Sequence, residues 1–177
     1  MFFQDKSNML WHPKQSIQKP KKEVSPMQNV EIRKFKKVLV ANRGEIAIRV
    51  YRALNELGIQ TVGIFSKEDK YALFRTKTDE AYMLNPEKGP LDAYLDIKNI
   101  IKIAKAKGVD AIHPGYGFLS ENPEFVQACE KAGIAFIGPN VDVMYKMGDK
   151  ISSKKMAIEC NVPIIPGVDH AVRSLDE

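Results

Sequence analysis

The sequence predicts an open, doubly wound α/β fold built around a parallel sheet. Short β-branched runs alternate with segments of helical period, several of these segments end at a glycine, and the first run passes directly into a glycine turn. Repeated strand–helix–strand units of this kind form right-handed parallel crossovers. The 177 residues, of which 44% are hydrophobic and 28% are charged, suffice for one domain with a sizeable core.

The first of these units spans residues 36–65. The run KVLVA at 37–41 is a predicted strand, and QTVGIF at 60–65 is the next one. Between them, apolar residues recur at i, i+4, i+8 and i+11, which predicts a helix with a single apolar stripe that stops at Gly58. The stripe consists of Ile46, Val50, Leu54 and Leu57.

The alternation continues beyond residue 65. Three further strands are expected at 81–84, 110–114 and 134–138, and three further helices at 97–108, 123–133 and 141–149. Asn122 is a suitable N-cap, and Pro123 suits a first helical position. Residues 150–160 look helical, whereas Pro163 and Pro166 exclude a central strand after them. We therefore expect one domain over residues 35–149 and the start of a second over 150–177.

Residues 1–34 differ from the rest in charge. They hold seven basic and three acidic residues, so +4 of the net charge of +5 lies in this stretch. The remaining residues are nearly neutral overall and offer no basic footprint for DNA or RNA. With Pro13, Pro20 and Pro26, residues 1–34 are expected to form a flexible basic extension.

Targeting and metal-binding patterns are weak. No apolar run approaches the ~20 residues that a membrane span needs, and residues 1–34 contain neither an apolar signal-peptide core nor more than one arginine. Cys129 and Cys160 lie far apart, and no Cys/His cluster has metal-ligand spacing. We expect a soluble cytoplasmic protein with no metal site of its own and no nucleic-acid or membrane partner.

Two glycine turns follow predicted parallel strands, where ligands gather in such folds. The first, ANRGEIA at 41–47, has one glycine where a dinucleotide fingerprint needs three, which disfavours nicotinamide or flavin binding. The second, IHPGYGFLSEN at 112–122, places Gly115 and Gly117 on either side of Tyr116. Paired glycines permit positive φ or close approach by a ligand, and the alternative is a tight turn whose tyrosine packs on its own sheet.

Charged residues in three further places allow both a structural and a functional interpretation. Glu45, Arg49, Arg52 and Glu56 share the helix face opposite the apolar stripe. This face is either solvated or docked against a twofold copy of itself. His113 precedes a proline and more simply ends a strand than acts as a base. Lys150 is either solvated or, at a hinge beside a nucleotide, a phosphate ligand.

Four motifs together resemble the N-terminal region of biotin carboxylase in order and spacing. They are VLVANRGEIAIRV at 38–50, AIHPGYGFLSEN at 111–122, FIGP at 136–139 and MGDK at 147–150. The segments between them, among them SKEDK at 66–70 and LDAYLDI at 91–97, are most similar to the pyruvate carboxylase type. The resemblance covers residues 36 to about 168.

This resemblance implies a Rossmann-like domain that precedes an ATP-grasp fold. The family activates bicarbonate with ATP and Mg²⁺ and carboxylates biotin on a carrier. Carried over by motif, Lys150 would touch nucleotide phosphate, and Tyr116 with Gly117 would line the biotin pocket. Arg49, Arg52 and Glu56 would lie at a homodimer interface formed by the first helix. Other implied partners are the remaining carboxylase domains, including the biotin carrier and the carboxyltransferase.

The groups that the family uses for catalysis come later than residue 177. They include the glycine-rich ATP lid, the magnesium-binding glutamates, and the basic residues that handle bicarbonate and biotin. We therefore expect the 177 residues alone to contain no catalytic residue, to bind none of these cofactors tightly and to be inactive. The alternative is a non-catalytic module that dimerises through its first helix. The final carboxyl acceptor, pyruvate or an acyl-CoA, stays open.

Overall fold

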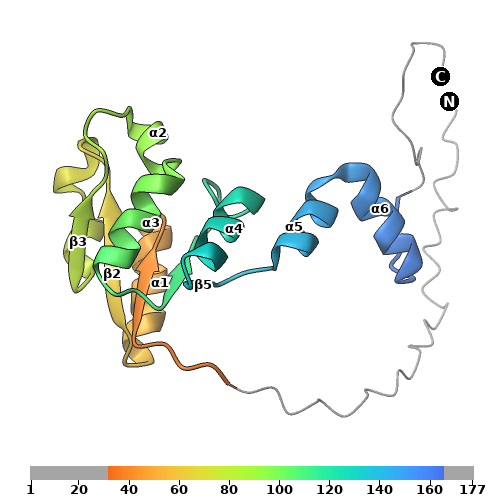
Figure 1. The fold of residues 1–177 in the computed structure, drawn as a ribbon, viewed down its shortest axis with the longest axis horizontal. Coiled ribbons are helices and arrows are strands. Elements are labelled where there is room, and N and C mark those ends of the chain that lie inside the picture. The colour runs from red at the N-terminus through yellow and green to blue at the C-terminus, as the bar shows by residue number, and fades with distance from the viewer. Residues whose placement is uncertain (1–31, 166–177) are drawn as a thin grey trace, which may run out of the picture. The chain divides into compact units, whose positions relative to one another are not determined.

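A computed structural model describes residues 32–165, and its centre is a five-stranded sheet (Figure 1). The strands are parallel throughout and are ordered β3-β2-β1-β4-β5. Their bounds are β1 Lys37–Val40, β2 Gln60–Phe65, β3 Glu80–Met83, β4 Ala111–His113 and β5 Ala135–Phe136. The predicted doubly wound α/β fold and all five predicted strands are confirmed, although β5 pairs over only two residues.

Within residues 32–165, six α-helices and two 3-10 helices connect and follow the strands. The α-helices are α1 Gly44–Glu56, α2 Pro90–Tyr94, α3 Ile97–Ala106, α4 Pro123–Lys131, α5 Val141–Gly148 and α6 Lys150–Glu159. The 3-10 helices are η1 Glu68–Tyr71 and η2 Leu73–Lys77. The sequence predicts α1, α3, α4, α5 and α6 within a few residues. It misses α2, η1 and η2, because four or five residues are too few to show a helical period.

The two faces of the sheet bury different sets of side chains. Leu39 of β1 packs into one core cluster with residues of α3 and α4, such as Ile100 and Phe125. Val38 and Val40, its neighbours in β1, point to the opposite face and pack with residues of α1. This alternation follows from the two-residue period of a strand. In Figure 1, α3 and α1 accordingly lie on opposite sides of the sheet.

The face that α1 buries is rotated from the predicted stripe. Ala47, Tyr51 and Leu54 are the buried residues of the helix, whereas Leu57 is 73% exposed. The large Tyr51 ring can lie under the helix because β2 carries Gly63 opposite it, where a Cβ would come 2.6 Å from the Tyr51 hydroxyl. A glycine in one strand thus makes room for the buried Tyr51 ring, and the spacing of apolar residues in α1 alone does not show this.

Helix ends follow the expected chemistry. The Asn122 side chain accepts a hydrogen bond of 2.9 Å from the Phe125 amide, as an N-cap does, and Pro123 is the first residue of α4. Gly58 takes φ +69° just after α1. Asp149 alone separates α5 from α6 and caps α6 through the Ser152 amide, so Lys150 is the first residue of α6.

Two expectations from the sequence concern residues outside the described part. All but the last three residues of the predicted basic extension lie there, and so do Pro166 and the rest of the chain to residue 177. Between residues 32 and 165, none of the helices is long and apolar enough to cross a membrane.

Candidate functional site

The strand order reverses direction between β1 and β4. The chain moves from β1 outward to β2 and β3, then returns to β4 on the other side of β1 and continues to β5. The helices that follow these two central strands, α1 and α4, pack on opposite faces of the sheet. The loops after β1 and β4 therefore border a crevice at the carboxyl edge, which is where open α/β sheets bind ligands.

Both predicted glycine turns meet at this crevice. The loop after β1 holds Asn42 and Arg43, and the loop after β4 runs from Pro114 to Phe118. Together with the start of α1 they surround a cavity of about 530 Å³. Its lining residues are Asn42, Arg43, Gly44, Glu45, Ile46, Tyr116, Gly117 and Phe118. The structure thus brings Tyr116 and Gly117 next to the N-terminus of α1.

Asn42 connects the two loops. Its side-chain nitrogen donates hydrogen bonds of 2.8 Å to the carbonyl oxygens of Pro114 and Tyr116. Its side-chain oxygen accepts a hydrogen bond of 2.9 Å from the Arg43 amide. The residue is 1% exposed, so these contacts satisfy a buried amide group. The crevice is therefore bridged at its floor by one side chain.

The glycines of the second loop have different surroundings. Gly115 has φ +66°, and a Cβ there would come 2.5 Å from the Asn42 side-chain nitrogen. Gly117 has φ +68°, but a Cβ there would meet no atom within 4 Å. Only a glycine at position 115 lets the backbone lie this close to the Asn42 side chain, whereas the space over Gly117 is open. Because Tyr116 between them is 78% exposed, its ring does not pack on its own sheet, which was the alternative interpretation of this turn.

A second set of polar contacts supports the site from the side of β2. The Arg43 guanidinium donates hydrogen bonds of 2.7 and 2.5 Å to the two carboxylate oxygens of Asp69 in η1. The Tyr94 hydroxyl donates a hydrogen bond of 2.8 Å to the same carboxylate. The Arg43 guanidinium holds the pKa of Asp69 below its ordinary value, and desolvation raises the pKa of Tyr94. Asp69 is therefore ionised at neutral pH, and Tyr94 is not.

The Tyr94 ring extends this support to the second loop. It stacks on Phe118 with ring centroids 5.0 Å apart and an interplanar angle of 21°. Phe118 has φ +45°, an unusual backbone conformation for a residue with a side chain. Sequence reasoning missed Asp69, Tyr94 and the role of Arg43. The only signal was Arg43 at a strand end, and nothing in the sequence pattern pairs it with residue 69.

His113 ends β4, in agreement with its structural interpretation. Its Nδ1 accepts a hydrogen bond of 3.0 Å from the Gly115 amide, so the neutral ring carries its proton on Nε2. Burial lowers the pKa of His113 below its ordinary value. The neutral imidazole therefore helps to shape the turn before Tyr116.

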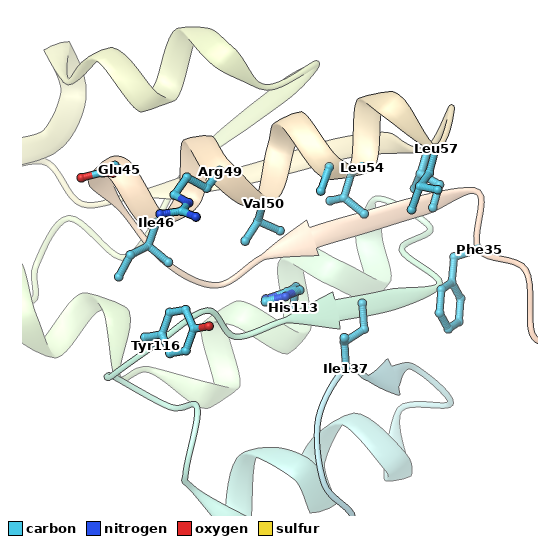
Figure 2. Close-up of a pocket in the computed structure, with 12 residues that line it drawn as sticks. Phe35, Glu45, Ile46, Arg49, Val50, Leu54, Leu57, His113, Tyr116 and Ile137 are labelled. Carbon is cyan, nitrogen blue, oxygen red and sulfur yellow. The ribbon is translucent and has the colours of Figure 1, made fainter.

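A larger groove lies along α1 (Figure 2). It measures about 660 Å³, and Figure 2 shows Phe35 at one end and Tyr116 at the other. The side of α1 that faces it carries all four residues of the predicted apolar stripe, namely Ile46, Val50, Leu54 and Leu57. Arg49 and Glu45 border the groove as well. The structure thus places Arg49, predicted at a dimer interface, on the same groove as Tyr116.

The remaining predicted site residues are exposed. Arg52 and Glu56 lie on the outer face of α1, and Lys150 begins α6. Lys150 is not among the residues that line either cavity. Within residues 32–165, no group of three or more His, Cys, Asp or Glu side chains is placed to hold a metal ion.

Comparison with known proteins identifies the family. The family model described as "Biotin carboxylase, N-terminal domain" matches residues 34–144. Mitochondrial pyruvate carboxylase of Mus musculus is 53% identical over 151 residues, which are 85% of this chain and 13% of that protein. Pyruvate carboxylase of Bacillus subtilis is 54% identical over 142 residues, which are 80% of this chain and 12% of that protein. The chain thus spans about an eighth of the length of these relatives.

A solved structure agrees with this match. The biotin carboxylase domain dimer of Hydrogenobacter thermophilus 2-oxoglutarate carboxylase, in complex with MgADP, ADP and bicarbonate, has a TM-score of 0.77 against this chain at 49% identity. The match covers 82% of this chain and 32% of that one. Family model, sequence identity and fold agree, and the chain belongs to the family of biotin carboxylase N-terminal domains, close to that of pyruvate carboxylase.

Proposed function

We propose that the chain is the N-terminal part of an ATP-dependent biotin carboxylase of the pyruvate carboxylase type. In the complete enzyme, ATP, Mg²⁺ and bicarbonate serve to carboxylate biotin on its carrier. The observation that carries the proposal is the meeting of the two glycine turns at the β1–β4 crevice, where Tyr116 and Gly117 face open space. The chain would supply one wall of the biotin site.

The surroundings of Tyr116 and Gly117 suit a flat bicyclic ligand such as the biotin ring system. The space over Gly117 lets a ring approach the backbone closely, because no side chain intervenes. The exposed Tyr116 ring offers an apolar surface and a hydroxyl beside it. These residues can bind and orient the ligand.

Lys150 is proposed as a contact of the nucleotide phosphates. Its ammonium is exposed at the start of α6, and a compact positive charge there suits phosphate. In this proposal the domain of residues 35–149 ends at Asp149, the N-cap of α6, and residues 150–177 begin the ATP-grasp domain.

We further propose that the 177 residues alone are inactive and bind ATP, Mg²⁺ and biotin weakly. Phosphoryl transfer depends on metal ions and on preorganised charge, and the described residues offer no acidic cluster for Mg²⁺. The test is ADP release by the pure chain, with and without bicarbonate. Bicarbonate-dependent release that Lys150→Ala abolishes would contradict this part of the proposal.

The groove along α1 is assigned to contacts with the rest of the enzyme, which includes the biotin carrier and carboxyltransferase domains. Parallel sheets are covered on both faces in complete domains, yet Ile137, beside β5, lines an open groove. The chain covers 32% of the related biotin carboxylase domain, and in that domain the remaining residues are available to cover this face.

We also propose a cytoplasmic location. The mouse relative is named mitochondrial, so the location needs its own test by cell fractionation. Recovery of the protein in mitochondria would contradict a cytoplasmic location.

A second candidate function is a non-catalytic dimerisation module. The observation that favours it is the exposed outer face of α1, where Arg52 and Glu56 stand one helical turn apart and can meet their opposites across a twofold axis. The related domain from Hydrogenobacter thermophilus is described as a dimer. Dimerisation through α1, with Arg49 at its edge, is compatible with either function.

A chimera separates the two functions. Residues 34–144 of this chain would replace the matching residues of Bacillus subtilis pyruvate carboxylase, to which the chain is 54% identical. If the chain is an enzyme part, the chimera carboxylates biotin. If the chain is only a dimerisation module, the chimera folds and dimerises but carboxylates no biotin.

A further inference from the structure

We propose that Asn42 is a positioning residue of the biotin site, because its carboxamide fixes the backbone that presents Tyr116 and Gly117. The inference rests on the proposed function, in which these two residues line the site. Asn42 itself lies at the floor of the crevice, 1% exposed, and reaches the ligand only through the loop that it holds.

The hydrogen bonds of Asn42 leave it little freedom. Its two N–H groups are used by the carbonyl oxygens of Pro114 and Tyr116, each at 2.8 Å, and its oxygen accepts from the Arg43 amide. Swapping the nitrogen and oxygen would set oxygen against two carbonyls and nitrogen against an N–H, so the amide has one favourable orientation. The side chain therefore fixes two peptide groups on either side of Gly115.

The loop needs this support because its backbone is unusual. Gly115, Gly117 and Phe118 all have positive φ, of 66°, 68° and 45°. For Phe118 this conformation costs about 1–2 kcal/mol, which the surrounding contacts must offset. Tyr116 does not hold the loop by packing, because its side chain is 78% exposed.

The loop is held from beneath at two points. One is Asn42, whose side chain lies so close under Gly115 that any Cβ there would clash with it. The other is the stack of Phe118 on Tyr94, whose hydroxyl is fixed by Asp69. Loss of Asn42 would free the middle of the loop while the stack still holds its end. The expected result is a folded protein whose Tyr116 and Gly117 are mispositioned.

The first experiment uses the 177-residue chain and NMR hydrogen exchange. The Asn42 side-chain amide protons should exchange slowly, because both are bonded in a buried site. In Asn42→Asp, which keeps the shape but loses both donors, the amides of residues 115–118 should exchange at least about tenfold faster. Asn55→Asp, on the exposed end of α1, is the matched control and should leave these amides unchanged. Asn42→Ser, which keeps one donor, serves if the aspartate variant fails to fold.

The second experiment uses the chimeric pyruvate carboxylase with free biotin as acceptor. Asn42→Asp should raise the KM for biotin about tenfold and change the KM for ATP less than twofold. General damage to the fold would affect both constants, so this split is what positioning predicts. Equal changes in both, or slow exchange of the loop amides in Asn42→Asp, would overturn the inference.

Tyr116→Ala in the same chimera distinguishes this inference from the proposed function. If Tyr116→Ala raises the KM for biotin while Asn42→Asp does not, the positioning role of Asn42 is wrong and the biotin site stands. If neither variant changes the KM for biotin, the assignment of biotin to this loop is wrong, and the inference that rests on it is overturned as well.

Discussion

Arg43 and Asp69 form an ion pair that joins the loops after two neighbouring strands. The pair consists of two parallel hydrogen bonds, 2.7 Å from Arg43 Nε to Asp69 Oδ2 and 2.5 Å from Arg43 Nη2 to Asp69 Oδ1. The Asp69 side chain is 9% exposed, whereas that of Arg43 is 49% exposed. The carboxylate is thus desolvated and depends on its partners, while the guanidinium still contacts water.

Removal of the arginine should therefore destabilise the fold. Arg43→Met keeps the aliphatic stem but removes both hydrogen bonds from Arg43 to the Asp69 carboxylate. The hydrogen bond from the Tyr94 hydroxyl to this carboxylate is kept. We expect a loss of about 2 kcal/mol in the free energy of unfolding, measured by urea denaturation. Lys102→Met on the exposed surface of α3 is the control and should change it by less than about 0.5 kcal/mol. Equal losses in both variants would contradict a structural role for the pair.

The same ion pair predicts a pH dependence. Because Arg43 lowers the pKa of Asp69 in the folded protein, the pair stabilises the fold above the ordinary carboxyl pKa of about 3.9. This stabilisation should be lost as the pH falls through the lower folded pKa. Asp69→Asn should remove that part of the acid-induced loss, which a comparison of urea denaturation at several pH values below 5 can detect.

His113 should titrate below its ordinary range. Burial lowers its pKa, and protonation of Nδ1 would break the hydrogen bond from the Gly115 amide. NMR titration should give a pKa below about 6.5. Since the unfolded chain binds this proton more readily, the fold should lose stability as the pH falls from about 6.5 through the lower folded pKa. His113→Asn should weaken this dependence, and an unchanged pH profile would argue against the buried neutral ring.

The two glycines around Tyr116 should respond differently to alanine. Gly117→Ala meets open space, so its cost is the strain of a positive φ, about 1–2 kcal/mol. Gly115→Ala has the same strain and also pushes against the Asn42 side chain, which should cost about 2 kcal/mol more. Thermal or urea denaturation of the two variants checks this order. Equal losses would mean that Asn42 does not lie under Gly115.

Dimerisation through α1 is tested by charge reversal. Arg52→Glu should raise the dimer dissociation constant at least about tenfold, because like charges would face each other across the axis. Combining it with Glu56→Arg should restore association. Lys102→Glu, on α3, is the control. Light scattering that shows monomers for the unchanged chain, with no effect of Arg52→Glu, would contradict the proposed interface.

The sequence predicts those parts of the fold that are local and periodic. The β-branched runs at residues 37–41 and 60–65 give β1 and β2, and the cap residues Asn122 and Gly58 mark helix ends correctly. The rotation of α1 was not predicted, because it depends on Gly63 in another strand making room for Tyr51. Short elements such as α2 carry too few residues for a period.

Long-range contacts of the site were beyond the sequence pattern for the same reason. The resemblance pointed to Tyr116 and Gly117, and the glycines predicted an unusual loop. Nothing local pairs Arg43 with Asp69, or Tyr94 with Phe118, because these partners are 24 to 26 residues apart and lie on different elements. A polar residue placed directly after a central parallel strand, as Asn42 is, was the one signal that could have indicated the bridge across the crevice.

The most direct test of the account is biotin carboxylation by the chimera that carries residues 34–144 of this chain in Bacillus subtilis pyruvate carboxylase. Incorporation of labelled bicarbonate into free biotin would be measured with ATP and Mg²⁺ present, beside the 177-residue chain alone. We predict carboxybiotin from the chimera, a clear loss of it in Tyr116→Ala, and none from the chain alone. A folded chimera that forms no carboxybiotin, or equal product with and without Tyr116, would contradict the claim that this chain forms one wall of the biotin site.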